Sequence, residues 1–336
     1  MSKKPRPPKT SPVNGLLVVD KPVGPTSHDV VQWARRVLGT SQVGHTGTLD
    51  PMATGVLVLG VGQGTKLMAH LGAEDKCYEA VLRLGRGTST LDAEGEVTAR
   101  APVPAGLDLA RVREVAAGFV GEHSQQAPAV SAIKIGGRAL HERARAGEVV
   151  DAPFRDVVCH ALEVRDVAQV ADDPDGAVDV SLALHTGKGY YVRSLGRDLA
   201  RALGTEGHLV ALRRTRNGHF DADMALDGRL LAGMHDDACR AATRAALLPL
   251  PRAVASLGTL QVDEHAVLEL RFGRALPLDA LAPVRSWDEV PAGPVFALLG
   301  PDGQLVALVE RRDERLHVVR GFPPSPPETP WNTSST

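Results

Sequence analysis

Residues 44–55 read GHTGTLDPMATG, and this stretch decides how the rest of the chain is interpreted. Its glycines, the Asp50-Pro51 pair and the polar side chains around them indicate a rigid loop. Apolar runs on both sides predict buried strands near 42–45 and over 56–61. We therefore expect a loop between two strands that presents the carboxylate of Asp50. Taken alone, an Asp-Pro pair is more often an ordinary β-turn whose carboxylate caps the backbone, so the role of Asp50 depends on the rest of the sequence.

The flanking sequence predicts more strands than helices. Gly15–Asp20 is typical of a strand, and a helix is expected to begin near Thr26 and to end at Gly39. Alternating apolar residues predict a strand over 76–84. Further strands are expected at 129–135, 156–170, 177–185 and 208–216, and helices at 107–119 and 192–203. Because these elements do not alternate regularly, the pattern favours an α+β fold with a mixed sheet over a doubly wound fold.

The length of 336 residues predicts two domains. The first is expected over 14–250, and the segment 233–256 is interpreted as a connector. Residues 258–322 contain short apolar runs around a Gly-Pro-Asp-Gly turn, which predicts a small, mostly β domain. The two ends, 1–13 and 323–336, are rich in proline and poor in apolar side chains, so we expect both to be disordered tails.

The composition excludes several classes of protein. With a formal net charge of -2 and 23% charged residues, the chain is neither globally disordered nor basic overall. The three cysteines lie about 80 residues apart, and His141-Glu142 lacks the second histidine of HExxH, so no metal site is expected. The glycine-rich stretch 60–66 has neither common nucleotide-binding spacing. No apolar run approaches the roughly 20 residues of a membrane span and no signal sequence follows the first residue, so we expect a cytoplasmic protein.

The 44–55 stretch resembles, almost residue for residue, the catalytic motif GHTGxLDPxATG of the TruB family of tRNA pseudouridine synthases. Five more segments resemble the family in its order: LLVVDKPVGPTSHDVV, KCYEAVLRLG, QQAPAVSAIKIGGRALHERARAGEVV, GKGYYVRSLGRDLARALG and HLVALRRTRNGHF. The resemblance covers about 14–220, and the C-terminal part fits the small RNA-binding PUA domain more weakly. Two departures, Ala129 in place of a common proline and His141 in place of a common tyrosine, do not touch the expected chemistry.

The resemblance implies a pseudouridine synthase catalytic domain, followed by a PUA-like domain, that isomerises the uridine at position 55 in the T loop of tRNA. It makes Asp50 the catalytic carboxylate, places Tyr78 against the target base and makes Arg193 the matching catalytic arginine. The residues expected to bind substrate are His45, Tyr191, Leu212, Lys21, Arg213 and Lys134. No cofactor or metal is implied. We expect the chain to bind the T arm of tRNA as a monomer.

Local charge agrees with an RNA partner although the whole chain is nearly neutral. Residues 188–216 hold seven basic side chains and two acidic ones, whereas 161–180 hold six acidic side chains and one basic one. A basic face of this kind can meet phosphates. By the same reasoning, Lys134 and the arginines after it are assigned to an RNA-gripping insertion near 122–150. The alternative interpretation is that these basic side chains are ordinary solvated charges on helix surfaces that bind no RNA.

The reaction needs a carboxylate that acts on a uridine taken out of the RNA stack. Asp50 could attack C1′ or C6, or assist elimination across the sugar, and the sequence leaves these three routes open. Arg193, always cationic, is the natural partner of that carboxylate. The alternatives are that Arg193 is a solvated helix charge and that His45 is satisfied within its loop. A second hypothesis for the chain, an RNA-folding chaperone that uses the same surface, is separated from an enzyme by an isomerisation assay.

Overall fold

The computed structural model describes residues 13–130, 134–135, 138–139, 152–233, 236–277, 295–312 and 314–324. Apart from residues 13, 323 and 324, the two expected tails lie outside these ranges. Within the described ranges, every helix is too short or too polar to cross a membrane.

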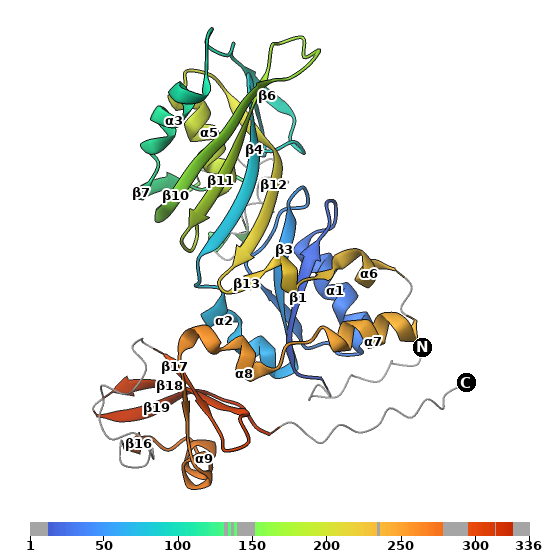
Figure 1. The fold of residues 1–336 in the computed structure, drawn as a ribbon, viewed down its shortest axis with the longest axis vertical. Coiled ribbons are helices and arrows are strands. Elements are labelled where there is room, and N and C mark those ends of the chain that lie inside the picture. The colour runs from blue at the N-terminus through green and yellow to red at the C-terminus, as the bar shows by residue number, and fades with distance from the viewer. Residues whose placement is uncertain are drawn as a thin grey trace.

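One ten-stranded sheet runs through the upper and middle parts of the molecule in the view of Figure 1. Its main path has the order β14-β1-β3-β12-β4-β11-β10-β7, while β2 pairs with β3 and β13 with β12. The strands are β1 Gly15–Lys21, β2 Val43–Thr46, β3 Thr54–Val61, β4 Lys76–Leu84, β7 Gly121–Gln126, β10 Phe154–Gln169, β11 Val178–Thr186, β12 Gly207–Asn217, β13 Phe220–Asp221 and β14 Leu226–Asp227. β3 and β12 pair in parallel, whereas β12, β4, β11 and β10 are successively antiparallel. The expected α+β fold with a mixed sheet is confirmed.

Helices cover the two ends of this sheet in two groups. Beside β1 and β3, α1 Ser27–Leu38 packs with α6 Gly228–Ala232 and α7 Asp237–Ala245, and beside β10 to β12 lie α3 Leu109–Ala117 and α5 Val192–Ala202 (Figure 1). α1 begins at a capping box of Thr26 and Asp29 and ends at Gly39, whose φ of 65° suits glycine. The segment 233–256 is more than a connector, because Cys239 of α7 is buried in the main core.

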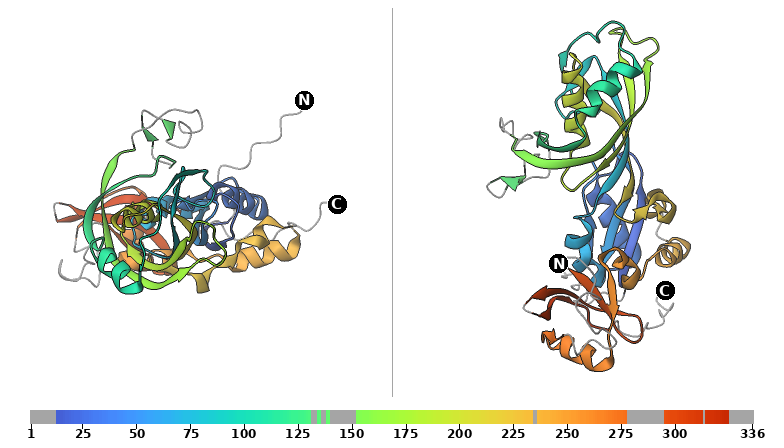
Figure 2. Two further views of the ribbon diagram at one scale, coloured as in Figure 1. Left: turned by 90° about the horizontal axis from the view of Figure 1, so that it is seen from above. Right: turned by 60° about the vertical axis from the view of Figure 1, so that its left-hand side comes forward.

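Short elements link these layers. They are the 3-10 helices η1 Gly62–Leu67, η2 Ala222–Met224 and η3 Ala255–Leu257, the helices α2 Met68–Leu71 and α8 Leu250–Ala253, and the paired strands β5 Arg86–Thr88 and β6 Val97–Arg100. The RNA-gripping insertion expected near 122–150 needs a correction at its start, because 122–126 belong to β7 and pair with β10 at the sheet edge. Beyond that edge, β8 Lys134–Ile135 and β9 Arg138–Ala139 pair with each other and stand away from the sheet (Figure 2). Residues 140–151 lie outside the described ranges.

In its described residues, the second domain contains a five-stranded sheet of order β15-β17-β18-β19-β16 and the helix α9. Its elements are β15 Thr259–Gln261, α9 Glu264–Arg271, β16 Leu276–Pro277, β17 Phe296–Leu299, β18 Leu305–Arg312 and β19 Arg315–Gly321. The expected small, mostly β domain is therefore present. Its Leu308 and Phe322 also share an apolar cluster with Leu16, Val56 and Phe220 of the first domain. The two domains are consequently joined by buried apolar contacts as well as by the chain.

Candidate active site

The loop that carries Asp50 lies between β2 and β3 and is fixed from several sides. The Ser27 hydroxyl accepts a hydrogen bond from the Leu49 amide at 2.8 Å and donates one to the Leu49 carbonyl at 3.0 Å. Gly55, at the start of β3, has a φ of 100°, and a Cβ there would lie 2.2 Å from the carbonyl oxygen of Arg214. Only glycine fits this close approach of β3 to β12. The loop that the sequence predicts between two strands is present, between β2 and β3.

Lys21 has a different position from the one expected of a substrate-binding residue. It is fully buried, and its ammonium group donates to the carbonyl oxygens of Pro22, Pro25 and Pro51 at 3.0, 2.8 and 3.2 Å. Burial lowers the pKa of Lys21 to about 8, although the nearby Asp50 carboxylate opposes that shift. Through the carbonyl of Pro51, the buried ammonium of Lys21 links the end of β1 to the loop that carries Asp50.

Arg193 forms a two-point ion pair with Asp50. Its Nε lies 2.8 Å from Oδ2 of Asp50, and its Nη2 donates to Oδ1 at 3.1 Å. The same guanidinium donates to the carbonyl oxygens of Thr90 and Val130 at 2.7 and 3.0 Å, and its Nη1 lies 3.3 Å from a carboxylate oxygen of Asp92. The Arg193 side chain is 6% exposed, so it is a buried and fully engaged group and not a solvated helix charge.

Opposing effects act on the protonation of Asp50. Burial raises the pKa of this carboxyl, and the Asp92 carboxylate adds to that effect. The positive charge of Arg193 lowers the pKa, as does the ammonium of Lys21. A partly buried carboxylate held by a planar guanidinium keeps one orientation and loses much of its hydration, which suits attack on a sugar or base carbon.

A pocket of about 250 Å³ opens above this ion pair. Its lining includes the ion pair of Asp50 and Arg193 together with Tyr78 of β4 and Leu212 of β12. The complete lining is Gly47, Thr48, Leu49, Asp50, Gly72, Lys76, Tyr78, Gly189, Tyr190, Tyr191, Val192, Arg193, Leu212 and Arg214. The structure thus brings Asp50, Tyr78, Arg193, Tyr191 and Leu212 together, as the sequence predicted. A flat ring between an aromatic and an aliphatic wall is the arrangement in which flipped bases are held.

Arg213 does not line this pocket, and Arg214 does. The guanidinium of Arg213 makes two hydrogen bonds to Asp20, at 2.9 and 2.8 Å, on the other face of the strand. Arg214 is 1% exposed and donates to the carbonyl oxygens of Val56 at 2.7 Å and Gly47 at 3.1 Å. Because strand side chains alternate, Leu212 and Arg214 share one face, which is a signal the sequence contained.

Two more groups of the site were missed from sequence. Lys76 lines the pocket, and burial lowers its pKa to about 8, with the neighbouring charge of Arg214 adding to the shift. Asp92 is buried beside Arg193. Lys76 could have been found from the same alternation that selects Tyr78. Nothing local distinguishes Asp92, which lies 101 residues before its partner in the chain.

His45 is not among the described residues that line the pocket. His45 is half-buried in β2, and among the described residues its Nδ1 has no hydrogen-bond partner. Burial lowers the pKa of His45, and the charge of Arg214 adds to that shift. Lys134 lies in β8, and its side chain is outside the described part of the chain.

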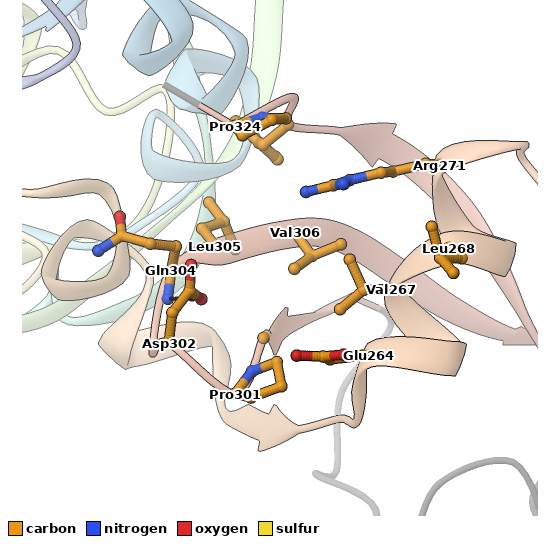
Figure 3. A pocket seen from close by; sticks show the side chains of 12 residues that line it. Glu264, Val267, Leu268, Arg271, Pro301, Asp302, Gln304, Leu305, Val306 and Pro324 are labelled. Atoms are coloured by element: carbon orange, nitrogen blue, oxygen red, sulfur yellow. Dashed lines mark hydrogen bonds between the residues drawn. The ribbon is translucent and has the colours of Figure 1, made fainter. Parts of the chain in front are cut away.

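A larger hollow, of about 810 Å³, lies in the second domain between α9 and β18 (Figure 3). Its middle is formed by Val267, Leu305 and Val306. Arg271 points toward Pro324 on one side, and Glu264 lies near Pro301 on the other (Figure 3). The figure shows no pair of opposite charges in contact here, unlike at Asp50.

Comparisons with known proteins agree with this site. The sequence profile of the N-terminal domain of TruB family pseudouridylate synthases matches residues 35–192, and the profile of the tRNA pseudouridylate synthase B C-terminal domain matches 193–255. The chain is 42% identical to tRNA pseudouridine synthase B of Corynebacterium efficiens over 307 residues, which are 91% of this chain and 95% of that protein. It is also 42% identical to the protein of the same name from Thermobifida fusca, over 89% of this chain and 95% of the relative.

Solved structures with the same fold cover both domains. A chain in the crystal structure of a Cbf5-Nop10-Gar1 complex superposes with a TM-score of 0.67 at 25% identity, over 93% of this chain and 85% of that one. A chain in an H/ACA RNP bound to a substrate RNA containing 2'-deoxyuridine gives a TM-score of 0.66 at 23% identity, over 93% of this chain and 86% of that one, and shows the fold alone. From the two profiles and the relatives, this chain belongs to the TruB family of pseudouridylate synthases.

Proposed function

We propose that this protein isomerises the uridine at position 55 in the T loop of tRNA to pseudouridine. The observation that carries the proposal is the two-point ion pair between Asp50 and the buried Arg193 in a pocket that Tyr78 and Leu212 also line. The family membership supports tRNA uridine isomerisation, since the relatives are named tRNA pseudouridine synthase B. No comparison favours a tRNA-folding chaperone without catalysis.

The reaction exchanges one bond of the base for another. The bond from C1′ to N1 breaks, the base turns within the pocket, and C1′ joins C5. The hydrogen on C5 must then leave, while N1 gains one, so the product is an isomer and no redox partner is needed. Asp50 supplies the carboxylate that attacks C1′ or C6 or assists elimination, and Arg193 keeps it charged and oriented. The hydroxyl of Tyr78 is the group we assign to assist proton transfer from C5.

The target base lies inside a folded loop and has to be flipped into the pocket. Tyr78 and Leu212 then hold the two faces of the ring, and Tyr191 lies at the pocket edge. His45, whose unpartnered nitrogen is outside the lining, is assigned to the space that the flipped base leaves. Lys134 and Arg213 are assigned to phosphates of the T arm, Arg213 after release from Asp20.

A single assay tests the reaction and its position. Unmodified tRNA transcripts are incubated with the protein, and pseudouridine is mapped at each uridine. We expect modification at position 55 with wild type and none with a transcript in which that uridine is a cytidine. Modification of other uridines with position 55 untouched would contradict the assigned substrate, and RNA binding without any isomerisation would favour the chaperone.

We also propose that the chain acts as a monomer in the cytoplasm. The relatives are bacterial, and bacterial tRNA is in the cytoplasm. The mass of the protein and of its tRNA complex in light scattering checks the first point, and cell fractionation checks the second.

A further inference from the structure

Three side chains with metal-binding atoms converge at one place outside the active-site pocket. Asp75, His160 and His185 each offer one ligand atom, and these atoms lie within 4.8 Å of one another. A single carboxylate oxygen, Oδ2 of Asp75, lies 3.3 Å from Nε2 of His160 and 3.3 Å from Nε2 of His185. Residues from three separate parts of the chain therefore aim at one point.

The sheet itself produces this convergence. Asp75 directly precedes β4, and His185 of β11 is in register with Cys77 of β4. His160 is the additional residue of a bulge in β10, because its neighbours on either side, and not His160 itself, pair with β11. A bulge re-aims a side chain, and here it turns His160 toward the neighbouring strand.

The distances fit a tetrahedral zinc ion. With Zn–N and Zn–O bonds of about 2.0 to 2.1 Å, two ligand atoms of one tetrahedron lie about 3.3 Å apart. Both contacts of the Asp75 oxygen have this length. Three protein ligands leave the fourth position for water, as at open zinc sites.

The site is also accessible to an ion from solution. The side chains of Asp75, His160 and His185 are 47%, 38% and 35% exposed. The two imidazole rings lie 4.7 Å apart between centroids.

We propose that Asp75, His160 and His185 bind one Zn²⁺ ion, with water as the fourth ligand. Side chains alternate along β4, so this site lies on the face opposite Tyr78 and is distinct from the pocket. Zinc here joins the start of β4 to β10 and β11. It also fixes Asp75, which is adjacent in the chain to the pocket residue Lys76. The proposal is independent of the reaction proposed above.

The test uses full-length protein without an affinity tag, treated with a chelator and then titrated with Zn²⁺ in a calorimeter. We expect one Zn²⁺ per chain and a higher melting temperature with zinc, because the ion binds the folded state. Co²⁺ should give the visible absorption of a tetrahedral site, and Mg²⁺, which prefers oxygen ligands in an octahedron, should not bind there.

His160→Gln and His185→Gln should each weaken Zn²⁺ binding by at least about tenfold. The matched control is His265→Gln, because His265 is exposed on α9 and outside the cluster, and it should bind as wild type does. Melting curves without metal verify that the variants fold. Absence of a zinc site in wild type, or unchanged binding in the two cluster variants, overturns the proposal.

Discussion

The hollow in the second domain and the pocket at Asp50 differ in both volume and chemistry. The hollow in the second domain measures about 810 Å³ and has an apolar middle, whereas the pocket at Asp50 measures about 250 Å³. Asp50 and Arg193 line the smaller one as an ion pair, and Arg193 also lies beside the buried carboxylate of Asp92. A buried ion pair therefore locates the reactive groups of this protein better than the volume of a pocket does.

The reason is energetic. Moving a charged side chain out of water is costly, so a chain keeps buried charges only where they are paired and hydrogen-bonded. Arg193 meets this condition through two carboxylates and two backbone carbonyls. The pair between Arg213 and Asp20 has similar bond lengths but is more than one third exposed, and its contribution to stability is correspondingly small.

The strongest test of this contrast is Asp50→Asn. The amide keeps the shape of the side chain and removes its charge, so turnover should vanish. RNA affinity should change by less than about tenfold, or roughly 1.4 kcal/mol. Pseudouridine formation and tRNA binding are measured on the same preparation. Turnover by a preparation free of wild-type protein would remove Asp50 from the chemistry.

Arg193→Gln tests whether the buried ion pair controls the pH dependence of the reaction rate. The carboxylate form of Asp50 is needed, so the rate falls as pH falls through the pKa of Asp50. Since the charge of Arg193 lowers that pKa, its removal should raise the pKa and move the acid limb of the rate profile to higher pH. At neutral pH we expect a loss of about a hundredfold.

The control for this change is Arg193→Lys, which keeps the positive charge and loses the two-point geometry. Its acid limb should stay near that of wild type, although its rate is lower. Melting curves show whether either variant is unfolded. An acid limb that does not move in Arg193→Gln would mean that Arg193 orients Asp50 without controlling its ionisation.

Two variants of Tyr78 distinguish its proposed role in base stacking from its proposed role in proton transfer. Tyr78→Phe keeps the ring, which is worth about 1 to 3 kcal/mol on a base, and removes the hydroxyl. We expect it to bind tRNA normally but to release tritium from 5-tritiated uridine far more slowly, whereas Tyr78→Leu should also bind more weakly. Tritium release at the wild-type rate in Tyr78→Phe would leave Tyr78 as a stacking wall alone.

The smallest effect on turnover is expected in the second domain. Phe322 lines the large hollow and is 4% exposed, in the apolar cluster that joins the two domains. Phe322→Ala should lower the free energy of unfolding by about 3 kcal/mol. The rate under folding conditions should change little. Urea unfolding measures the first quantity and a pseudouridine assay the second.

The matched control is Phe272→Ala, because Phe272 is 75% exposed in the same domain. It should leave stability nearly unchanged. A loss of turnover in folded Phe322→Ala comparable with that of Asp50→Asn would show that the contrast between the two hollows is false. The same cluster indicates that deletion from about residue 256 onward exposes Leu16 and Val56, so truncation tests stability together with RNA binding.

Much of the fold and of the reactive core could be predicted from sequence. The 44–55 motif located the Asp50 loop, and β4 was predicted with its bounds, Lys76–Leu84. These features depend on contiguous residues, since glycine, proline and alternating apolar side chains act within a few positions. Arg193 was found because it lies in a second contiguous motif.

The sequence by itself therefore determined the family, the mixed sheet and the carboxylate with its arginine partner. Only the tertiary structure decided that Lys21 is enclosed by three proline carbonyls, that Arg214 and not Arg213 faces the pocket, and that Asp92 completes the ion network. It also brought Asp75, His160 and His185 together. These contacts join residues that are far apart in the chain. The register of the strands, or a bulge in one of them, decides which side chains meet. The local sequence pattern predicts only the face of the strand on which each side chain lies.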